Sequence, residues 1–370
     1  MSAPVDLDSD DPLLRLEHVS KAFPVQNSSL FTRQREFVHA VDDVSLEVQP
    51  GETLGLVGET GCGKSTLARC IARLYDLTTG SVTFDGKDIS HLSRREMRPL
   101  RSEIQMIFQD PYGSLNPRRR VGSIIGDPFA IHGTDSRGDR KKKVQDLMER
   151  VGLNPEHYNR FPAEFSGGQR QRIGTARALA LRPRMVICDE PVSALDVSIQ
   201  AQIINMLKDL QDDFGLTYIF ISHDLSVVRH VSDRIAVMYL GRIVEIAPSA
   251  DLFERSRHPY TRALLSALPV ADPDTADRRE RIVLVGDIPS PTNPPTGCRF
   301  HTRCPKAQPD CVQTDPALER MFQDAGQHQA ACLHPLADDE DLSSAKPQIE
   351  DSEILTTPVP GLASGAEGAP

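Results

Sequence analysis

The sequence predicts an α/β fold built on a parallel β-sheet, and three short runs of residues carry that prediction. Residues 53–57, 185–188 and 218–221 are mostly apolar, as buried strands are. Each run leads into a polar or glycine-rich turn, and helix-like segments separate the runs. This alternation is typical of parallel sheets, which bind ligands at the carboxyl ends of their strands.

The rest of the chain divides into further regions. Residues 14–19 and 40–48 resemble more exposed strands, and we expect a small antiparallel β-subdomain there, interrupted by a loop at 24–37. A helical subdomain is expected at about 111–180, where Val144, Leu147, Met148 and Val151 recur at three-to-four spacing. The main domain then spans 13–257, and a proline-rich, loop-rich extension spans 258–336.

The formal net charge of −10 is concentrated at the two ends of the chain. Residues 1–12 carry four acidic and no basic residues, and residues 337–370 carry eight acidic residues and one lysine. The body is therefore close to neutral, which argues against charge-driven binding of nucleic acid. Both ends are too poor in apolar residues to form a core, so we expect disordered acidic tails at 1–12 and 337–370.

The apolar residues give no sign of membrane insertion or export. No run approaches the roughly 18 apolar residues of a membrane span, and the N-terminus lacks the basic and apolar regions of a signal peptide. We therefore expect a cytoplasmic chain. Because that compartment is reducing, the seven cysteines are not expected to form disulfides.

Residues 58–65 read Gly-Glu-Thr-Gly-Cys-Gly-Lys-Ser and fit the phosphate-loop pattern G-x-x-x-x-G-K-[ST]. The loop follows the strand at 53–57 and precedes a helix in which Leu67, Ile71 and Leu74 share one face. This strand, loop and helix context is the one that the pattern requires. The residues expected to contact the nucleotide or its magnesium ion are Gly58, Gly61, Cys62, Gly63, Lys64, Ser65 and Thr66.

Each residue type in this loop suits the binding of phosphate. Glycines let successive backbone N–H groups approach the phosphate oxygens, and the start of the helix adds its positive end. Lys64 is expected to reach the β- and γ-phosphates, and Ser65 to ligate magnesium. Cys62 is interpreted as a small residue of the loop.

Two carboxylates end the apolar run at 185–188. Asp189 is expected to hold magnesium, and Glu190 to polarise the attacking water. The alternative is that the two acids cap a helix beginning at Pro191. His223 follows the run at 218–221, where it could donate to the γ-phosphate, although a lone histidine is more often structural.

A second anion site is predicted where Phe165-Ser-Gly-Gly-Gln opens a helix-forming run. Ser166 is a natural N-cap, and Gly167 and Gly168 leave the helix N-terminus open to an anion. Gln169 completes this motif. One phosphate loop and a second phosphate-seeking helix end in the same chain favour a head-to-tail dimer with the nucleotide between the subunits.

Together these motifs resemble those of an ATP-binding-cassette (ABC) transporter subunit. In family order they are the phosphate loop 58–66, Gln109 of the Q-loop, the signature 166–169, the Walker B end at Asp189 and Glu190, the D-loop ending at Asp196, and the switch residue His223. The resemblance implies that two ATP molecules with Mg2+ close a dimer and that hydrolysis reopens it. Glu190 would activate water, and His223 would hold the γ-phosphate. Gln109 would contribute to the magnesium site and couple the magnesium and the water to a membrane partner.

The resemblance also implies an aromatic residue stacked on adenine. Phe23 is the expected residue, with Phe31 and Phe37 as alternatives in the loop that follows it. The signature departs from the usual family form, because Phe165 stands where leucine is common.

Four of the seven cysteines lie within 35 residues, with the spacing C-x5-C-x6-C-x20-C. Cys298, Cys304, Cys311 and Cys332 suit a metal centre, and the absence of a C-x2-C pair favours an iron–sulfur cluster over zinc. Zinc and unligated thiols remain alternatives. The segments 258–260, 288–291 and 297–305 resemble the C-terminal extension of dipeptide, oligopeptide and nickel importers, which implies a [4Fe-4S] cluster.

The expected function is therefore that of an ATPase subunit of an importer of dipeptides or oligopeptides. Residues 109–117 resemble in particular the second of the two ATPase subunits of such importers. This implies a second ABC ATPase subunit, two transmembrane permease subunits and an extracytoplasmic substrate-binding protein as partners, at the cytoplasmic face of the membrane. The alternatives are a nickel importer, an exporter, and a cassette ATPase that acts on nucleic acid or ribosomes.

Overall fold

The computed structural model describes residues 11–25, 36–110, 113–133, 137–268, 282–321, 327–338, 340–342, 345 and 347. The chain divides into two compact units. The first contains Met1–Lys21, Asp43–Val57 and Lys64–Ile235, and the second contains Ala22–Asp42, Gly58–Gly63 and Ala236–Pro370.

The first unit is built on parallel strands, as the sequence predicts. Strand β3 (Thr53–Val57) pairs with β8 (Thr217–Ile221), which pairs with β7 (Met185–Asp189), which pairs with β6 (Ile104–Ile107). Every residue of β3, β7 and β8 is buried, because helices cover both faces of such a sheet. Helix α1 (Lys64–Ile71) packs on β7 and β8, and α7 (Leu225–Val231) packs on β3.

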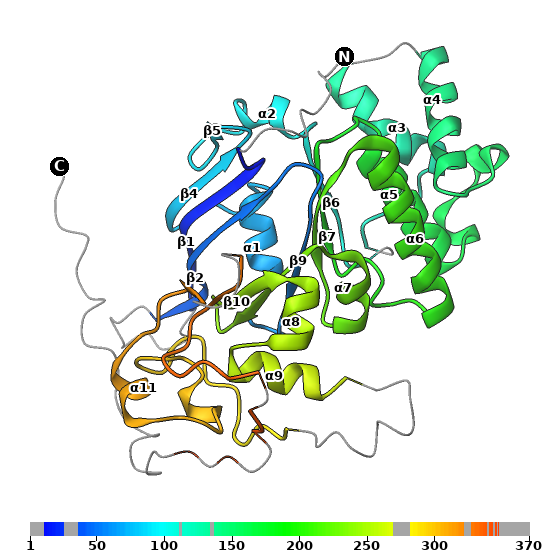
Figure 1. Ribbon diagram of the computed structural model, residues 1–370. Coiled ribbons are helices and arrows are strands. Elements are labelled where there is room, and N and C mark those ends of the chain that lie inside the picture. The colour runs from blue at the N-terminus through cyan, green and yellow to red at the C-terminus, as the bar shows by residue number, and fades with distance from the viewer. Residues whose placement is uncertain are drawn as a thin grey trace, which may run out of the picture. The chain divides into compact units, whose positions relative to one another are not determined.

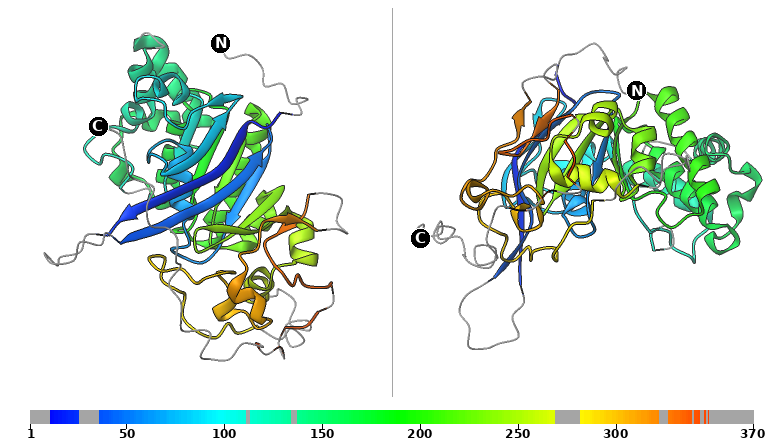
Figure 2. Two further views of the ribbon diagram at one scale, coloured as in Figure 1. Left: turned by 90° about the vertical axis from the view of Figure 1, so that its left-hand side faces the viewer. Right: turned by 60° about the horizontal axis from the view of Figure 1, so that its bottom comes forward.

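A four-stranded sheet accounts for the expected β-subdomain. Its order is β2 (Phe37–Val48), β1 (Leu14–Pro24), β4 (Thr79–Phe84) and β5 (Lys87–Asp88), drawn in blue and cyan in Figure 2. β1 and β4 are antiparallel, and their register shifts between Glu17 and Ser20. β1 and β2 correspond to the expected strands at 14–19 and 40–48 but are longer, and β4 and β5 were not expected. Most of the expected loop at 24–37 lies outside the described residues.

The helical segment of the first unit packs as its periodicity predicts. Helices α3 (Val121–His132), α4 (Arg137–Arg150) and α5 (Gly167–Leu179) lie together, with the 3-10 turns η1 (Pro155–Asn159) and η2 (Pro162–Glu164) between α4 and α5 (Figure 1). Val144, Met148 and Val151 are fully buried and Leu147 is nearly so. Helix α6 (Val197–Phe214) packs against α5, and the short α2 is Met97–Leu100.

One expectation about α1 is wrong. Leu67 and Ile71 are buried on one face as predicted, but the helix ends at Ile71 and Leu74 is 45% exposed. Arg73 has a left-handed backbone with φ of 51°, which stops the helical repeat before Leu74. The Arg73 side chain is buried instead and donates to the carbonyl of Ile89 at 2.8 Å.

The second unit contains most of β9 (Arg234–Tyr239), then β10 (Arg242–Pro248), and the helices α8 (Ser249–Arg255) and α9 (Pro259–Ser266). The extension then adds η3 (His301–Arg303), α11 (Pro309–Gln313), β11 (Glu319–Arg320) and β12 (Gln329–Ala330). β12 lies antiparallel between β10 and β11. Through β12 the extension thus pairs with β10, the strand that precedes it in the chain.

A buried carboxylate holds the extension at this point. Glu245 of β10 is fully buried and accepts the backbone N–H groups of Arg257 at 2.6 Å and His258 at 3.0 Å. Its Oε1 lies 2.7 Å from Nε2 of the buried His328. A buried carboxylate is stable only with such partners, so Glu245 fixes both ends of the extension to β10.

The beginning of the expected acidic tail is packed. Asp338 pairs with Arg257 at 2.7 Å, Glu340 pairs with Lys306 at 2.5 Å, and Leu342 is 2% exposed. Charge pairing and a single buried leucine thus hold residues 338, 340 and 342, which composition alone assigned to the tail. Residues 348–370, and residues 1–10 of the other tail, lie outside the described residues.

In the part of the chain that the structure describes, no helix is both long and apolar enough to cross a lipid bilayer. All seven cysteines are free thiols, as expected.

Truncating a buried side chain of the central sheet should destabilise the first unit. Val186 in β7 is fully buried, so we expect Val186→Ala to cost about 2–3 kcal/mol through lost burial and a residual cavity. Val197→Ala is the matched control, since Val197 is 81% exposed. Urea unfolding followed by circular dichroism measures both, and equal midpoints for the two variants would contradict the assignment of β7 to the core.

Candidate nucleotide site and cysteine pocket

The phosphate loop connects β3 to α1 and has a backbone that only glycine can adopt at two points. Gly58 has φ of 148° and Gly63 has φ of 111°. A Cβ at Gly58 would lie 2.1 Å from the carbonyl oxygen of Met238, and a Cβ at Gly63 would lie 2.0 Å from that of Ala40. These distances are far below any real contact. The glycines are therefore required for the close packing of the loop as well as for its conformation.

Other residues of the loop lie as the sequence predicts. Gly61 also has a positive φ of 83°, and the space around its Cα is open. Cys62 is buried, and its carbonyl accepts the N–H of Gly241 at 2.8 Å. Lys64 begins α1 with a buried side chain, followed by Ser65 and Thr66.

A hydroxyl and a carboxylate meet at the start of α1. Ser65 Oγ donates to Asp189 Oδ1 at 2.8 Å, which brings the end of β7 against the first turn of the helix. Asp189 is 1% exposed. Burial raises the pKa of its carboxyl group, and the hydrogen bond from Ser65 opposes that rise. Hard oxygen donors of this kind are the ligands that Mg2+ prefers in proteins.

Glu190 stands at the centre of a second cluster. Its Oε2 accepts a hydrogen bond from Gln109 Nε2 at 2.8 Å and lies 3.4 Å from His223 Nδ1. Gln109 follows β6, Glu190 follows β7 and His223 follows β8, so parallel pairing brings three distant segments to one edge of the sheet. The Glu190 side chain is 15% exposed, whereas that of His223 is 54% exposed and open to a ligand.

The turn after β7 does not support the alternative of a helix cap at Asp189 and Glu190. Glu190 has a left-handed backbone with φ of 47°, and its N–H donates to the carbonyl of Ile221 at 3.0 Å. The next helix, α6, begins only at Val197. The residue before it, Asp196, makes no side-chain capping hydrogen bond and is exposed.

The helix start at α5 is confirmed as a capped N-terminus. Ser166 Oγ accepts the N–H of Gln169 at 3.3 Å, and Gln169 Oε1 accepts the N–H of Ser166 at 3.0 Å. The first turn contains no acidic residue. A Cβ at Gly168 would lie 2.5 Å from Ile199 Cγ2, so α6 packs directly on the helix backbone there. Gly167 precedes it at the open end of the helix.

The expected adenine-stacking residue is less well defined. Phe23 lies near the end of β1 and is half-buried, and Phe37 at the start of β2 is 41% exposed. Phe31 lies outside the described residues. The assignment of Phe23 therefore stays a prediction.

The four cysteines of the extension line one pocket of the second unit. Cys298, Cys304, Cys311 and Cys332 surround it, and the N–H of Cys298 donates to the carbonyl of Cys311 at 2.9 Å. The pKa of Cys298 is raised to about 11 and that of Cys332 to about 12, chiefly by burial, and the neighbouring thiols contribute to both rises. Four converging thiols whose anions repel one another suit a cation that would neutralise them.

The sequence interpretation did not assign any histidine to this pocket. His258, His301 and His334 also line it. His334 Nε2 lies 2.9 and 3.0 Å from the two carboxylate oxygens of Asp310. His301 Nδ1 lies 2.8 Å from the carbonyl of Cys298. The available signal was their sequence proximity to the cysteines, which alone does not distinguish them from other histidines.

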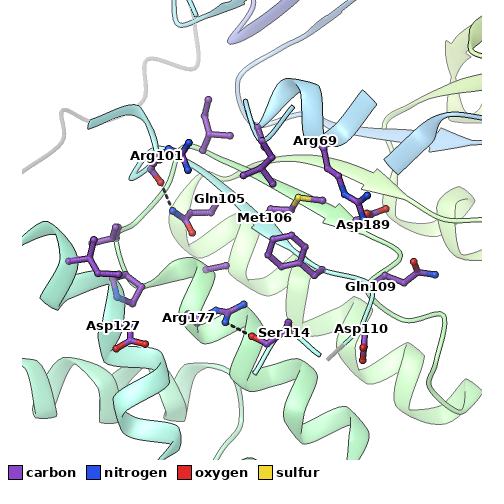
Figure 3. A pocket seen from close by; sticks show the side chains of 18 of the residues that line it. Arg69, Arg101, Gln105, Met106, Gln109, Asp110, Ser114, Asp127, Arg177 and Asp189 are labelled. Atoms are coloured by element: carbon purple, nitrogen blue, oxygen red, sulfur yellow. Dashed lines mark hydrogen bonds between the residues drawn. The ribbon is translucent and has the colours of Figure 1, made fainter. Parts of the chain in front are cut away.

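A cavity of about 790 Å³ adjoins Gln109 in the first unit, and no sequence pattern indicated it. It is lined by polar residues from several elements, among them Arg69, Arg101, Gln105 and Asp127 (Figure 3). Arg177 also lines it and donates to the carbonyl of Ser114 at 2.7 Å. The lining includes three exposed apolar side chains: Leu74, Phe108 and Ile131.

Comparisons with known proteins agree with this geometry. The family model described as "ABC transporter" matches residues 41–193, and the model described as "Oligopeptide/dipeptide transporter, C-terminal region" matches residues 244–311. The oligopeptide transport ATP-binding protein AppF of Bacillus subtilis is 54% identical over 325 residues, which are 88% of this chain and 98% of that protein. The oligopeptide transport ATP-binding protein OppF of Escherichia coli is 50% identical over 323 residues, with coverages of 87% and 96%.

A solved structure supports the fold. The dimeric ATP-binding cassette MJ0796, in a post-hydrolysis state bound to ADP and Pi, is 28% identical with a TM-score of 0.57. The match covers 64% of this chain and 98% of that one. With this fold, these motifs and relatives that match nearly end to end, the chain belongs to the ABC transporter family of ATPases, among the oligopeptide transport ATP-binding proteins that carry this C-terminal region.

Proposed function

We propose that this ABC ATPase energises the uptake of dipeptides or oligopeptides, bound to the cytoplasmic face of the membrane. The observation that carries the proposal is the combination in one chain of a complete hydrolytic cluster with the four-cysteine extension. The extension matches the C-terminal region of oligopeptide and dipeptide transporters, and the relatives described above are named for oligopeptide transport.

Phosphate binding would begin at the glycine-rich loop. Its backbone N–H groups and the start of α1 meet the negative charge, and Lys64 neutralises part of it. Ser65 and Asp189, which already touch at 2.8 Å, would hold magnesium between them and the phosphates. When bound, Mg2+ neutralises charge that develops on the phosphate oxygens.

Hydrolysis would depend on Glu190. We assign it to orienting and deprotonating the attacking water, with its carboxylate held by Gln109. His223, which is exposed and beside Glu190, would donate to the γ-phosphate. With these roles, the acceptor for the proton of water and the donor to the phosphate would lie side by side.

The second anion site calls for a second subunit. The α5 N-terminus at Ser166, Gly167, Gly168 and Gln169 would contact the ATP bound to the opposite subunit, and Asp196 would lie beside it at the same interface. We propose a heterodimer with a second ABC ATPase. Two permease subunits and an extracytoplasmic binding protein would complete the importer.

The cavity beside Gln109 is a suitable contact for a permease subunit. It combines apolar side chains at Leu74, Phe108 and Ile131 with arginines, as a docking site for an amphipathic segment requires. Gln109 lines the cavity and also holds Glu190. A partner in the cavity could therefore change the position of the catalytic carboxylate.

We further propose that the cysteine pocket holds a [4Fe-4S] cluster. Four thiolates around one zinc ion would lie roughly 3.8 Å apart, given a tetrahedral Zn–S distance of about 2.3 Å. Among the described residues, the group of three or more possible ligand atoms within 4.8 Å of one another is Asp310, Cys311 and His334, not the four cysteines. Within the described residues no three of the four thiols meet this 4.8 Å criterion, which favours a polynuclear cluster over a single zinc ion.

Replacing the proposed base should separate binding from hydrolysis. Glu190→Gln keeps the hydrogen bond to Gln109 but removes the proton acceptor, so we expect steady-state ATPase to fall about 100-fold or more. ATP binding should be retained, and the closed dimer should accumulate. Glu149→Gln, at an exposed position on α4, is the control. Normal ATPase in Glu190→Gln would refute the assignment.

Asp189→Asn should abolish the stabilisation by ATP with Mg2+ without lowering the stability of the protein alone. Because burial raises the pKa of this carboxyl group, ionising it costs more free energy in the folded protein than in the unfolded one. A neutral amide removes that penalty, so we expect the melting temperature without nucleotide to stay equal or rise. The increase in melting temperature produced by ATP with Mg2+ should be lost. Thermal unfolding with and without the nucleotide measures both, and a full Mg2+-dependent increase would contradict the role of Asp189.

Metal analysis after anaerobic purification tests the cysteine pocket. We expect iron and sulfide in equal amounts together with a broad visible absorption, and Cys298→Ala should lower both. Cys70→Ala is the matched control, because Cys70 is a buried cysteine of α1 outside the pocket. Zinc in place of iron, or no metal, would refute the cluster.

A further inference from the structure

The phosphate loop is divided between the two units of the chain. The strand before it and the helix after it belong to the first unit, whereas Gly58–Gly63 group with Ala236–Pro370 in the second. The loop residues thus make their local contacts with the part of the chain that contains the extension. Gly58 packs on the carbonyl of Met238, and Cys62 accepts the N–H of Gly241.

The strongest of these contacts come from the extension. Arg303 Nη1 lies 2.8 Å from Glu59 Oε2, and Arg303 Nη2 lies 3.1 Å from Glu59 Oε1, which is a two-bonded guanidinium–carboxylate pair. The Arg303 side chain is 8% exposed and that of Glu59 is 24% exposed. The hydroxyl of Tyr260 in α9 accepts the backbone N–H of Glu59 at 2.9 Å. Both the side chain and the backbone of Glu59 are therefore held.

Aromatic packing holds Arg303 and Tyr260 in place. Tyr260 packs against Tyr239 and Phe300 with ring centroids 4.7 and 5.4 Å away, and Tyr239 and Phe300 lie 5.3 Å apart. The guanidinium carbon of Arg303 lies 5.9 Å from the centroid of the Tyr239 ring. Tyr239, Tyr260 and Phe300 are at most 1% exposed. Side chains fixed in this way lose little conformational freedom when they hold the loop.

The pairing of Glu59 with Arg303 matters for nucleotide binding because of the charge of Glu59. Glu59 is an acidic residue inside a loop whose purpose is to receive phosphate. An uncompensated carboxylate there would repel the ligand, because opposite charges attract and like charges repel most strongly where solvent is partly excluded. Arg303 neutralises the carboxylate and draws it toward the extension. Two parallel hydrogen bonds also fix its direction, which a single lysine contact would not.

We propose that Arg303 and Tyr260 are positioning residues of the nucleotide site, through which the C-terminal extension sets the affinity of the phosphate loop for nucleotide. Arg303 immediately precedes Cys304, so the segment that lines the cysteine pocket also holds the loop. The inference rests on the proposed role of this loop in binding phosphate. It adds a second function to the extension, because the cysteines alone indicate only metal binding.

The test is the equilibrium binding of MgADP to the full-length chain by calorimetry, since ADP binds without turnover. We expect Arg303→Ala to raise the Kd about 5- to 30-fold, because the loop loses its neutralising partner. Tyr260→Phe keeps the aromatic packing and removes only the hydroxyl, so a rise of about 2- to 10-fold is expected. Arg255→Ala is the control, because Arg255 pairs with Asp251 within α8 of the same unit.

A rescue distinguishes positioning from general support of the fold. In the Arg303→Ala background, Glu59→Gln removes the uncompensated charge, so the double variant should bind MgADP more tightly than Arg303→Ala alone. A purely structural role predicts no rescue, because the second substitution restores no contact. Circular dichroism and the melting temperature without nucleotide check that each variant is folded.

The outcomes separate this inference from the proposed function on which it rests. Lys64→Ala should abolish MgADP binding, and if it does not, the assignment of the phosphate loop itself fails. If Lys64→Ala loses binding while Arg303→Ala and Tyr260→Phe keep the wild-type Kd, the inference alone is overturned. Should Arg303→Ala fail to fold, Arg303→Lys takes its place, and unchanged Kd values for it and Tyr260→Phe overturn the inference equally.

Discussion

The parallel pairing of β6, β7 and β8 places polar residues from three distant parts of the chain at one edge of a buried sheet. Because every residue of β7 and β8 is buried, the register of these strands cannot slip without exposing apolar side chains. Gln109, Glu190 and His223 each follow the last residue of their strand within two positions. The hydrophobic core thus fixes the geometry of the proposed hydrolytic cluster.

Asp189 shows the cost of that placement. It is the last residue of β7, almost fully buried, and its raised pKa means that the folded protein holds an ionised carboxylate there at a disadvantage. The hydrogen bond from Ser65 compensates only in part. A buried carboxylate that is costly to ionise alone would be stabilised by a bound cation, which suits the proposed role of Asp189 as a magnesium ligand.

The extension is joined to the rest of the second unit by polar groups as much as by apolar ones. Glu245 binds two backbone N–H groups and His328, and Arg303 binds Glu59. Such contacts need specific geometry, whereas apolar packing tolerates small shifts.

The sequence by itself determined the parallel strands, the phosphate loop and the helix cap at Ser166, because each depends on residues that are neighbours in the chain. Apolar runs end where the strands end, and glycines stand where the backbone turns. The sequence overestimated the length of α1. The left-handed backbone of Arg73 ends the helical repeat, so Leu74 is exposed. Composition likewise placed 337–342 in the acidic tail, because it cannot register the pairing of Asp338 with Arg257.

Only the tertiary structure decided which distant residues meet. The contact of Gln109 with Glu190, of Arg303 with Glu59, and of His334 with Asp310 joins residues whose types occur many times in the chain. Nothing in the local sequence selects one glutamate over another as the partner of Arg303. The pairing arises because the cysteine-bearing extension folds back beside β10 and meets the phosphate loop, and that approach depends on the packing of the whole second unit.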